Sequence, residues 1–343
     1  MWHRLPIDGF LAAMLTAVIL ASLYPALGAS HGPLHLDQVT TVGVGLVFLL
    51  SGVGLSTDKL KLGARNWRLH VFVQSSTFIL FPLIGIAAMT SLGGLLPHEL
   101  LVGFFFLCAL SSTVSTSIAM TTLARGNVAG AVFNATLSSL IGMLVTPLLV
   151  SVCLHASGQG VSLGRQLLDV TEQLLLPFVA GQLLRPLLAD WVARHKNVSS
   201  KVDRGVIVLI VYNSFCDSSQ AGLWTNYGVL TLMQTLLLAG GLLAIVLSVT
   251  TLAARRFHFS KEDEITAVFC GSKKSLATGI PMAKLLFGGS AGGSAALGLI
   301  VLPIMFYHQL QLIICSIIAR RYALRGDDAH GALVGSTAAP PGT

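Results

Sequence analysis

The sequence predicts an all-α integral membrane protein whose ten transmembrane helices form two inverted repeats of five. Three observations support this: an apolar composition, basic loops on one side of the membrane, and an internal repeat. Of the 343 residues, 54% are hydrophobic and 10% are charged, whereas a soluble globular domain carries about 25% charged residues. The apolar residues occur in blocks that reach the roughly 20 helical residues needed to cross a bilayer.

Ten segments have this length. The first half of the chain contains Asp8–Leu27, Leu36–Leu55, Arg68–Ser91, Glu99–Ala124 and Val128–Leu154. The second half contains Leu167–Leu188, Gly205–Leu223, Val229–Ala254, Asp263–Phe287 and Ser294–Ala319. Discontinuous helices are expected in the fourth and ninth segments.

The basic residues of the connecting loops fall on one side of the membrane if all ten segments cross it. They are Arg4, Lys59, Lys61, Arg65, Arg68, Arg125, Arg194, Lys196, Lys201, Arg204, Arg255, Arg256, Lys261, Arg320, Arg321 and Arg325. By the positive-inside rule, both termini are expected in the cytoplasm, with the protein in a cell membrane such as the bacterial inner membrane. The net charge of +7 is therefore explained by basic loops on the cytoplasmic side, and no nucleic-acid partner is predicted.

An internal repeat divides the chain. Residues Cys108, Thr116, Ile118, Met120, Leu123 and Gly126 are repeated, at an offset of about 162, as Cys270, Thr278, Ile280, Met282, Leu285 and Gly288. Because each half holds an odd number of spans, the second half must lie inverted in the membrane, as in many secondary transporters. The predicted units are residues 1–160, residues 161–322 and a disordered cytoplasmic tail, 323–343.

Polar residues in the fourth and ninth spans are the main site candidates. The fourth span contains Ser111, Ser112, Thr113, Ser115, Thr116 and Ser117, and the ninth contains Ser272, Lys273, Lys274 and Ser275. Gly271, Gly279 and Pro281 predict an unwound stretch in the ninth span, which is tolerated at this depth only where it lines a cavity or is buried in protein.

The two lysines are the strongest candidates. A lysine at the centre of a transmembrane helix costs at least about 2.5 kcal/mol, so a function or a fixed partner is expected. The positive ends of two half-helices would add to the ammonium field, which favours a small organic anion as the solute. No metal site, catalytic residue or cofactor is predicted.

Three further polar residues are weaker candidates. Asp217 in the seventh span could carry a proton or meet water at the end of its helix, and His308 could titrate or be a satisfied buried histidine. Gln74 could line a cavity or pair between helices.

The motif Phe269–Ala277 (FCGSKKSLA) resembles the bile acid:sodium symporter-like family. Residues 123–129, 173–182 and 307–311 fit the same family, and the chain is most similar to its lysine-bearing branch. The resemblance implies that spans three to five and eight to ten form a core domain. This core moves by a rocking or elevator motion against a panel of spans one, two, six and seven.

The resemblance also implies that sodium coupling of the bile acid symporter type is absent. Their Ser-Asn pair corresponds to Ser117 and Ile118, and their later hydroxyls to Ala131 and Ala135. Their Glu and Gln in the ninth span correspond to Phe269 and Lys273. Most hard oxygen ligands for Na⁺ are thus missing, and a lysine ammonium could replace the ion. The coupling ion, proton or sodium, stays open.

Two other functions stay open. The first is a channel or a non-transporting regulator of ion homeostasis. The second is an intramembrane hydrolase, because Gly288–Gly292 matches G-x-S-x-G and His308 follows, although the strand–turn–helix context of that motif is missing. The sequence does not determine the solute, the direction of transport, the oligomeric state or whether one or both lysines are charged.

Overall fold

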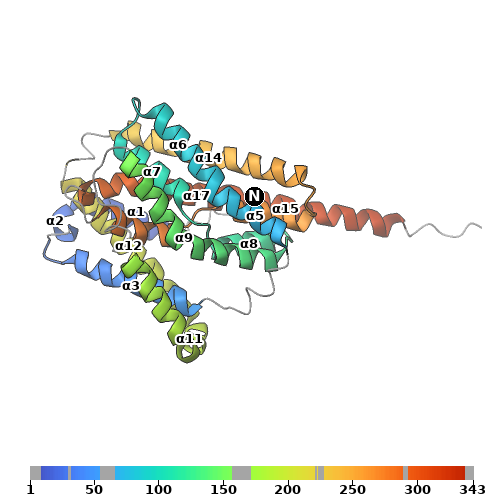
Figure 1. The fold of residues 1–343 in the computed structure, drawn as a ribbon, viewed down its shortest axis with the longest axis horizontal. Coiled ribbons are helices and arrows are strands. Elements are labelled where there is room, and N and C mark those ends of the chain that lie inside the picture. Colours follow the sequence, from blue (N-terminus) through green and yellow to red (C-terminus); the bar gives the residue numbers. More distant parts are fainter. Residues whose placement is uncertain are drawn as a thin grey trace, which may run out of the picture.

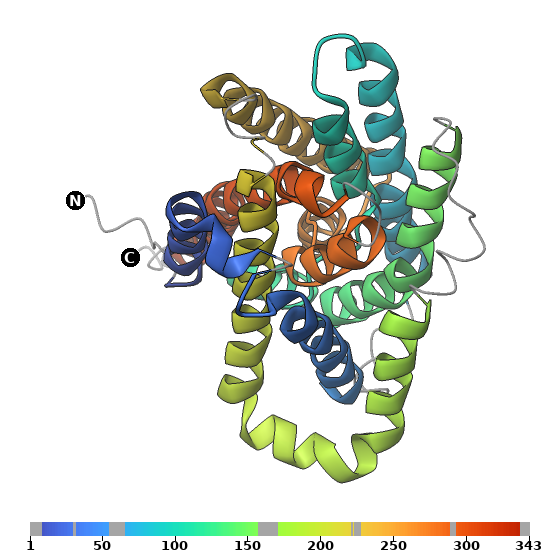
Figure 2. The ribbon, with the colours of Figure 1, turned by 90° about the vertical axis from the view of Figure 1, so that its left-hand side faces the viewer.

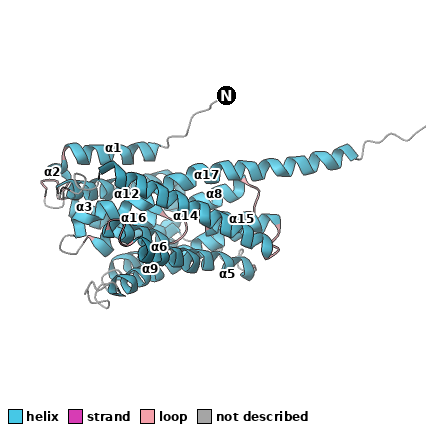
Figure 3. Ribbon diagram, turned by 90° about the horizontal axis from the view of Figure 1, so that it is seen from above, coloured by secondary structure: helices cyan, strands magenta, loops and turns pink. Residues whose placement is uncertain are grey.

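The computed structural model describes residues 9–29, 32–54, 66–156, 171–220, 222, 228–288 and 293–336. Within these ranges the regular structure is entirely helical. Most helices run along the long axis of the molecule, and α17 extends beyond the others at one end (Figure 1, Figure 3).

The first half of the chain begins with α1 (Gly9–Leu23), α2 (Pro25–Gly28) and α3 (Leu36–Gly54). The third predicted span is one continuous helical path made of α5 (Trp67–Ser75), the π-helical turn η1 (Ser76–Leu80) and α6 (Phe81–Leu92). The next elements are α7 (His98–Ala109), α8 (Ser115–Leu123) and α9 (Val128–Ala156).

The second half begins with the π-helical turn η2 (Thr171–Leu175), α11 (Leu176–Arg194) and α12 (Lys196–Gln220). It continues with α14 (Gly228–Arg256), α15 (Lys261–Gly271), α16 (Leu276–Phe287) and α17 (Gly293–Ser336). Ser260 starts α15 as an N-cap, because its side-chain oxygen accepts from the backbone N–H of Asp263 at 3.2 Å.

The described helices confirm a membrane protein. Six helical segments are long and apolar enough to cross a bilayer: Leu36–Gly54, Trp67–Leu92, Val128–Cys153, Glu172–Arg194, Gly228–Arg256 and Ala296–Leu324. The other predicted spans correspond to the shorter helix α1, to α12, which is less apolar, and to the interrupted pairs α7 with α8 and α15 with α16. Arg4, Lys59, Lys61 and Arg65 lie outside the described residues.

Two helices differ from their predicted bounds. α12 begins at Lys196 rather than Gly205, because a helix that leaves the apolar layer can continue through polar residues. α17 continues as far as Ser336, whereas a disordered tail is predicted from residue 323. Alanine and leucine residues, which have high helix propensity, recur beyond residue 322 and account for the extension.

α3 and α11 lie side by side at unusually close range. A Cβ atom added to Gly52 would lie 2.2 Å from the carbonyl oxygen of Phe178, and one added to Gly181 would lie 2.1 Å from that of Leu49. Only glycine allows this approach. Small residues commonly bring transmembrane helices together in this way, since lipid supplies no hydrophobic driving force between helices.

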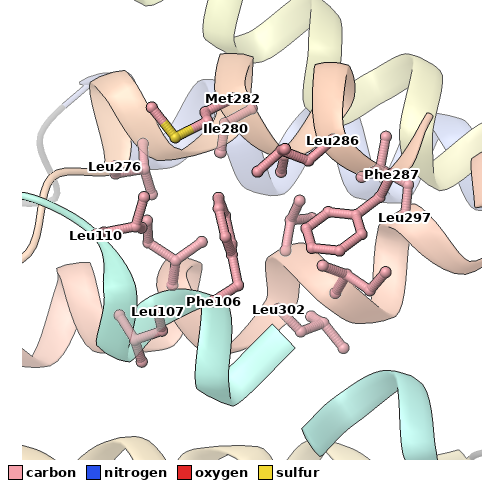
Figure 4. Packing of buried hydrophobic residues seen from close by; sticks show 14 of the residues in the cluster. Phe106, Leu107, Leu110, Leu276, Ile280, Met282, Leu286, Phe287, Leu297 and Leu302 are labelled. Carbon is pink, nitrogen blue, oxygen red and sulfur yellow. The ribbon is translucent and has the colours of Figure 1, made fainter. Parts of the chain in front are cut away.

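The centre of the molecule is formed by α7, α16 and the start of α17. Seen from one end, α16 and the start of α17 (orange) lie in the middle of the other helices (Figure 2). Phe106 and Leu110 pack against side chains of α16, including Ile280 and Phe287 (Figure 4). The Phe106 and Phe287 rings meet edge to face with centroids 5.4 Å apart. This packing holds in place the helix breaks described next.

Candidate functional site

Two helix breaks cross in the protein interior. Residues 110–114 separate α7 from α8, and residues 272–275 separate α15 from α16. The backbone N–H of Ser275 donates to the carbonyl oxygen of Ser111 at 2.9 Å, which joins the breaks directly. We call these two segments the crossover. The predicted unwound stretch of the ninth span is present but short, and Pro281 lies inside α16.

Lys274 is a fixed internal cation of the crossover. Its side chain is fully buried, and its ammonium donates to the carbonyl oxygens of Thr77 at 3.0 Å, Cys108 at 2.8 Å and Leu110 at 2.6 Å. The nitrogen also lies 4.0 Å from the centroid of the Phe81 ring, in a cation–π arrangement. An ammonium has three N–H donors, so Lys274 has none left for a solute.

Lys273 is equally buried but is less fully paired. Its ammonium donates to the carbonyl oxygen of Thr116 at 2.9 Å and lies 5.7 Å from the centroid of the Phe269 ring. This is its one hydrogen bond to the described part of the chain. Two of its three donors can therefore serve another ligand.

Hydroxyl groups of the site donate hydrogen bonds to the backbone carbonyl oxygens at the C-terminal end of α15. Ser117 donates to Phe269, Ser112 to Cys270, Ser76 to Gly271 and Tyr307 to Ser272. The shortest of these bonds is 2.6 Å, from the Tyr307 hydroxyl. The last carbonyls of a helix lack intrahelical partners, and lipid offers none. Two members of the predicted hydroxyl run, Ser112 and Ser117, therefore pair backbone carbonyls at the end of α15.

The remaining predicted hydroxyls lie near one another. The Thr113 and Thr116 hydroxyls are 2.6 Å apart, and those of Ser111 and Thr278 are 3.4 Å apart. Ser272 donates to its own helix, and Ser275 caps α16 by accepting from the backbone N–H of Thr278. Ser115 is exposed at the start of α8.

Gln311 holds the backbone of Lys274. Its side-chain oxygen accepts from the Lys274 backbone N–H at 3.0 Å, and its side-chain nitrogen donates to the Lys274 carbonyl at 2.9 Å. His308 lies one turn away, with Nδ1 3.0 Å from the Gln311 side-chain nitrogen. His308 therefore belongs to the layer that supports the crossover.

Gln74 and Asp217 lie elsewhere. The Gln74 side-chain nitrogen donates to the carbonyl oxygen of Asn134 at 3.1 Å, between α5 and α9. Asp217 lies on α12, where its carboxylate interacts electrostatically with Lys284 of α16. Asp217 therefore belongs to a second charged group.

The second charged group joins α16 to α3. Nζ of Lys284 lies 3.0 Å from the Asp37 carboxylate, donates to the Asp37 carbonyl at 3.0 Å and contacts the Thr40 hydroxyl. The Lys284 side chain is 7% exposed, whereas that of Asp37 is 54% exposed. A buried ammonium is thus held by a carboxylate that still meets solvent.

One face of the crossover is open. Val114, Ser115 and Ala277 are exposed, and Thr116 and Thr278 are partly exposed. These residues lie at the first turns of α8 and α16, where backbone N–H groups without intrahelical partners and the helix dipoles favour an anion, although Ser275 already pairs the N–H of Thr278. The Lys273 ammonium donates to the Thr116 carbonyl in the first turn of α8.

Residues 8–324 match the SBF-like CPA transporter family. The chain belongs to this family. An uncharacterized protein of Pseudomonas aeruginosa is 47% identical over 326 residues, 95% of this chain and 96% of that protein. The Escherichia coli K12 protein named "Putative symporter YfeH" is 43% identical over 316 residues, 92% of this chain and 93% of YfeH. The sodium/bile acid cotransporter 7-B of Xenopus laevis is 29% identical over 323 residues, 92% of each chain.

Membership of this transporter family, together with several apolar helices, shows that the chain is a multi-pass membrane protein. The expected resemblance is confirmed. Residues 289–292 of the G-x-S-x-G match lie outside the described residues.

Sequence reasoning missed part of this SBF-like site. Lys284 is a third lysine of the ninth span, and Asp37 heads the second span, so their opposite charges in apolar surroundings were an available signal. Gln311 was a candidate for cavity lining or an interhelical hydrogen bond, and residues 307–311 fit the family, but the sequence gave neither Gln311 nor Tyr307 a partner. A glutamine or a tyrosine is common between transmembrane helices, and only the fold brings these two against the crossover.

Proposed function

We propose that this SBF-like protein is a secondary active transporter that carries a small organic anion by alternating access. It would lie in the bacterial inner membrane with both termini in the cytoplasm and ten spans in two inverted repeats. In this proposal α5–α9 and α14–α17 form the core domain, and α1–α3, α11 and α12 form the panel. The pair of crossing helix breaks supports this arrangement, since such breaks mark the sites of secondary transporters.

The observation that carries the proposal is the pairing of the buried Lys274 ammonium with three backbone carbonyl oxygens. Carbonyl oxygens are typical ligands of hard cations. A fixed ammonium in their centre supplies the positive charge that a bound ion would otherwise supply. The crossover is then complete without sodium, and the energy for transport must enter elsewhere.

The solute site of the proposal is the open face of the crossover. An anionic group there would accept hydrogen bonds from the N-terminal N–H groups of α8 and α16. Lys273 would supply two further donors if the first turn of α8 shifts slightly, whereas Lys274 has none to offer. The two lysines therefore have different roles: Lys274 stabilises the crossover and Lys273 attracts the solute.

Alternating access would require the Lys284–Asp37 contact to break. Lys284 belongs to the core and Asp37 to the panel of the proposal, and Asp217 of the panel acts on the same ammonium. A proton taken up by either carboxylate would weaken the contact. This makes the proton the preferred coupling ion of the proposal.

The test is transport by purified protein. A library of organic anions is first screened for compounds that raise the melting temperature, because a ligand of the folded state stabilises it. Uptake of each such compound is then measured in proteoliposomes with an imposed proton gradient, a sodium gradient or neither. The proposal expects accumulation driven by the proton gradient, and a loss of uptake in Lys273→Gln while the protein stays folded.

Four results would contradict all or part of the proposal. Passive conductance of ions without uphill uptake would indicate a channel, and hydrolysis of a compound would indicate an enzyme. Unchanged uptake by folded Lys273→Gln would remove the lysine from the solute site. Uptake that requires a sodium gradient would overturn the proton coupling and leave the transporter assignment standing.

A further inference from the structure

A groove runs between the third-span helices and α14. It has a volume of about 560 Å³ and is lined mainly by aliphatic and aromatic side chains of both walls, among them Val71, Ile79, Leu83, Val249 and Phe257. Seen end-on, α14 (tan) and α5–α6 (teal) lie on the same side of the molecule (Figure 2). Three of the wall residues, Val71, Ile79 and Leu83, are each more than half exposed. The groove therefore opens to the lipid.

The groove exists because its two walls pack on other helices. α14 packs on α15, α17 and α7, while α5 and α6 pack on α15, α9 and α7. Small side chains form the floor, including Ser76 and Thr250, which lie against Gly271 at the end of α15. A single layer of small side chains thus separates this lipid-facing space from the crossover.

One end of the groove carries a cation that has no acidic partner among the described residues. The Arg68 guanidinium donates to the carbonyl oxygen of Phe257 at 3.2 Å and lies 5.8 Å from the centroid of the Phe259 ring. It forms no ion pair with a carboxylate in the described ranges. By contrast, nearby Arg255 pairs with Glu264 at 3.0 Å. An arginine with several remaining donors suits a phosphate group.

Trp67 places this end of the groove at the membrane surface. It is 68% exposed and precedes Arg68 at the start of α5, and tryptophan is enriched at the level of lipid headgroups. From there to Leu83 the wall spans 16 helical residues, or about 24 Å at 1.5 Å per residue. That length exceeds one leaflet, which is about half of a 30 Å hydrocarbon layer. A lipid with its phosphate at Arg68 would therefore fit one acyl chain along the walls.

We propose that the groove is a binding site for one anionic phospholipid, with the phosphate at Arg68 and an acyl chain between α5–α6 and α14. The apolar walls alone would accept any lipid tail. The uncompensated guanidinium selects a headgroup with net negative charge, since cationic side chains near the surface favour such lipids. This site is separate from the solute site proposed above and does not depend on transport.

The test compares phosphatidylglycerol with phosphatidylcholine of the same acyl chains. Delipidated full-length protein in detergent receives each lipid, and bound lipid is counted by native mass spectrometry while the melting temperature is recorded. The wild type should bind one phosphatidylglycerol with an affinity about fivefold or more above that for phosphatidylcholine, the factor expected from one surface cation. It should melt at a higher temperature with phosphatidylglycerol.

Two variants and two matched controls locate the site. Arg68→Gln should lose the preference for phosphatidylglycerol, whereas Arg256→Gln should keep it, because Arg256 is exposed at the end of α14 and does not line the groove. Ala253→Phe should fill the groove and lose the tightly bound lipid. Leu252→Phe should keep that lipid, because Leu252 is 66% exposed and lies outside the lining.

Equal binding of both lipids by the wild type would overturn the proposal, as would a phosphatidylglycerol preference that survives in Arg68→Gln. Loss of bound lipid in Leu252→Phe as well as Ala253→Phe would mean that the lipid sits elsewhere on α14. Because binding is measured directly, a variant with a lower melting temperature still gives a result.

Discussion

Lys284 and Asp37 form an ion pair in which Nζ lies 3.0 Å from the carboxylate oxygen. The pair joins α16 to α3, and the Lys284 ammonium also donates to the Asp37 carbonyl. Its lysine is buried and its aspartate is half exposed. A contact of this kind is stable enough to hold one arrangement of helices and weak enough to be broken, because a solvated carboxylate loses little when its partner leaves.

We expect Lys284→Gln and Asp37→Asn to lower the melting temperature, and the double variant to lower it by less than the sum. The expected coupling is about 0.2–1 kcal/mol, the range for ion pairs with an exposed partner. Thermal unfolding of the four proteins measures it. Additive effects would mean that the pair contributes nothing beyond its separate hydrogen bonds.

The same pair should affect transport if α16 moves against α3. We expect Lys284→Gln to change the uptake rate of a solute found in the screen, because it weakens one of the two end states. Arg255→Gln is the control, since it removes the Arg255–Glu264 pair between α14 and α15, both on the core side of the proposal. Equal effects of the two variants would contradict a gating role for Lys284.

The two crossover lysines should differ in their effect on stability. Lys274→Met removes the donor of three buried carbonyl oxygens, whereas Lys273→Met removes the donor of one. Each buried acceptor left unpaired costs about 1–3 kcal/mol. We therefore expect the larger loss of melting temperature in Lys274→Met. The reverse order would show that Lys273 is the structural cation.

Sodium should not stabilise the wild-type protein. The Lys274 ammonium already occupies the carbonyl oxygens of the crossover, and a folded-state ligand raises stability only where it finds a free site. Melting temperatures in sodium chloride and potassium chloride of equal ionic strength should agree. A saturable rise with sodium alone would reveal a sodium site outside the lysine cluster.

Even the smallest enlargement of a glycine side chain at the contact between α3 and α11 should destabilise the protein. Gly181→Ala places a methyl group 2.1 Å from the Leu49 carbonyl oxygen, so α3 and α11 must separate and stability should fall. The control is Gly241→Ala, where an added Cβ meets nothing within 4 Å. That change should raise stability by about 0.5–1 kcal/mol, the usual gain in a helix interior. Circular dichroism during heating distinguishes the two.

The helices and the lysine motif could be predicted from local sequence. Apolar block length marks transmembrane helices because the bilayer has a fixed thickness, and the predicted spans agree with α3, α9 and α14 within a few residues. Lys273 and Lys274 stood out because a charge at such depth is costly. The extent of α12 and α17 was missed, since helix continuation outside the bilayer depends on propensity and packing rather than on hydrophobicity.

The roles of the polar residues could not be predicted. Asp217 and Gln74 look as suitable as Ser112 in the sequence, yet Ser112 donates to the Cys270 carbonyl at the end of α15 and Gln74 pairs with Asn134 instead. Which buried donor meets which buried acceptor depends on contacts between residues far apart in the chain. Periodicity and composition do not report such contacts.

By itself, the sequence determined that this chain is a helical membrane protein of a transporter family, with two helix breaks and two deeply placed lysines. Only the tertiary structure decided that Lys274 uses all three ammonium N–H donors in hydrogen bonds to the protein, whereas Lys273 uses one. It also decided that Lys284 joins α16 to α3. The physical reason is that membrane insertion is decided segment by segment, through hydrophobicity. The pairing of an ammonium is decided by the carbonyl groups that three-dimensional packing brings within hydrogen-bonding distance.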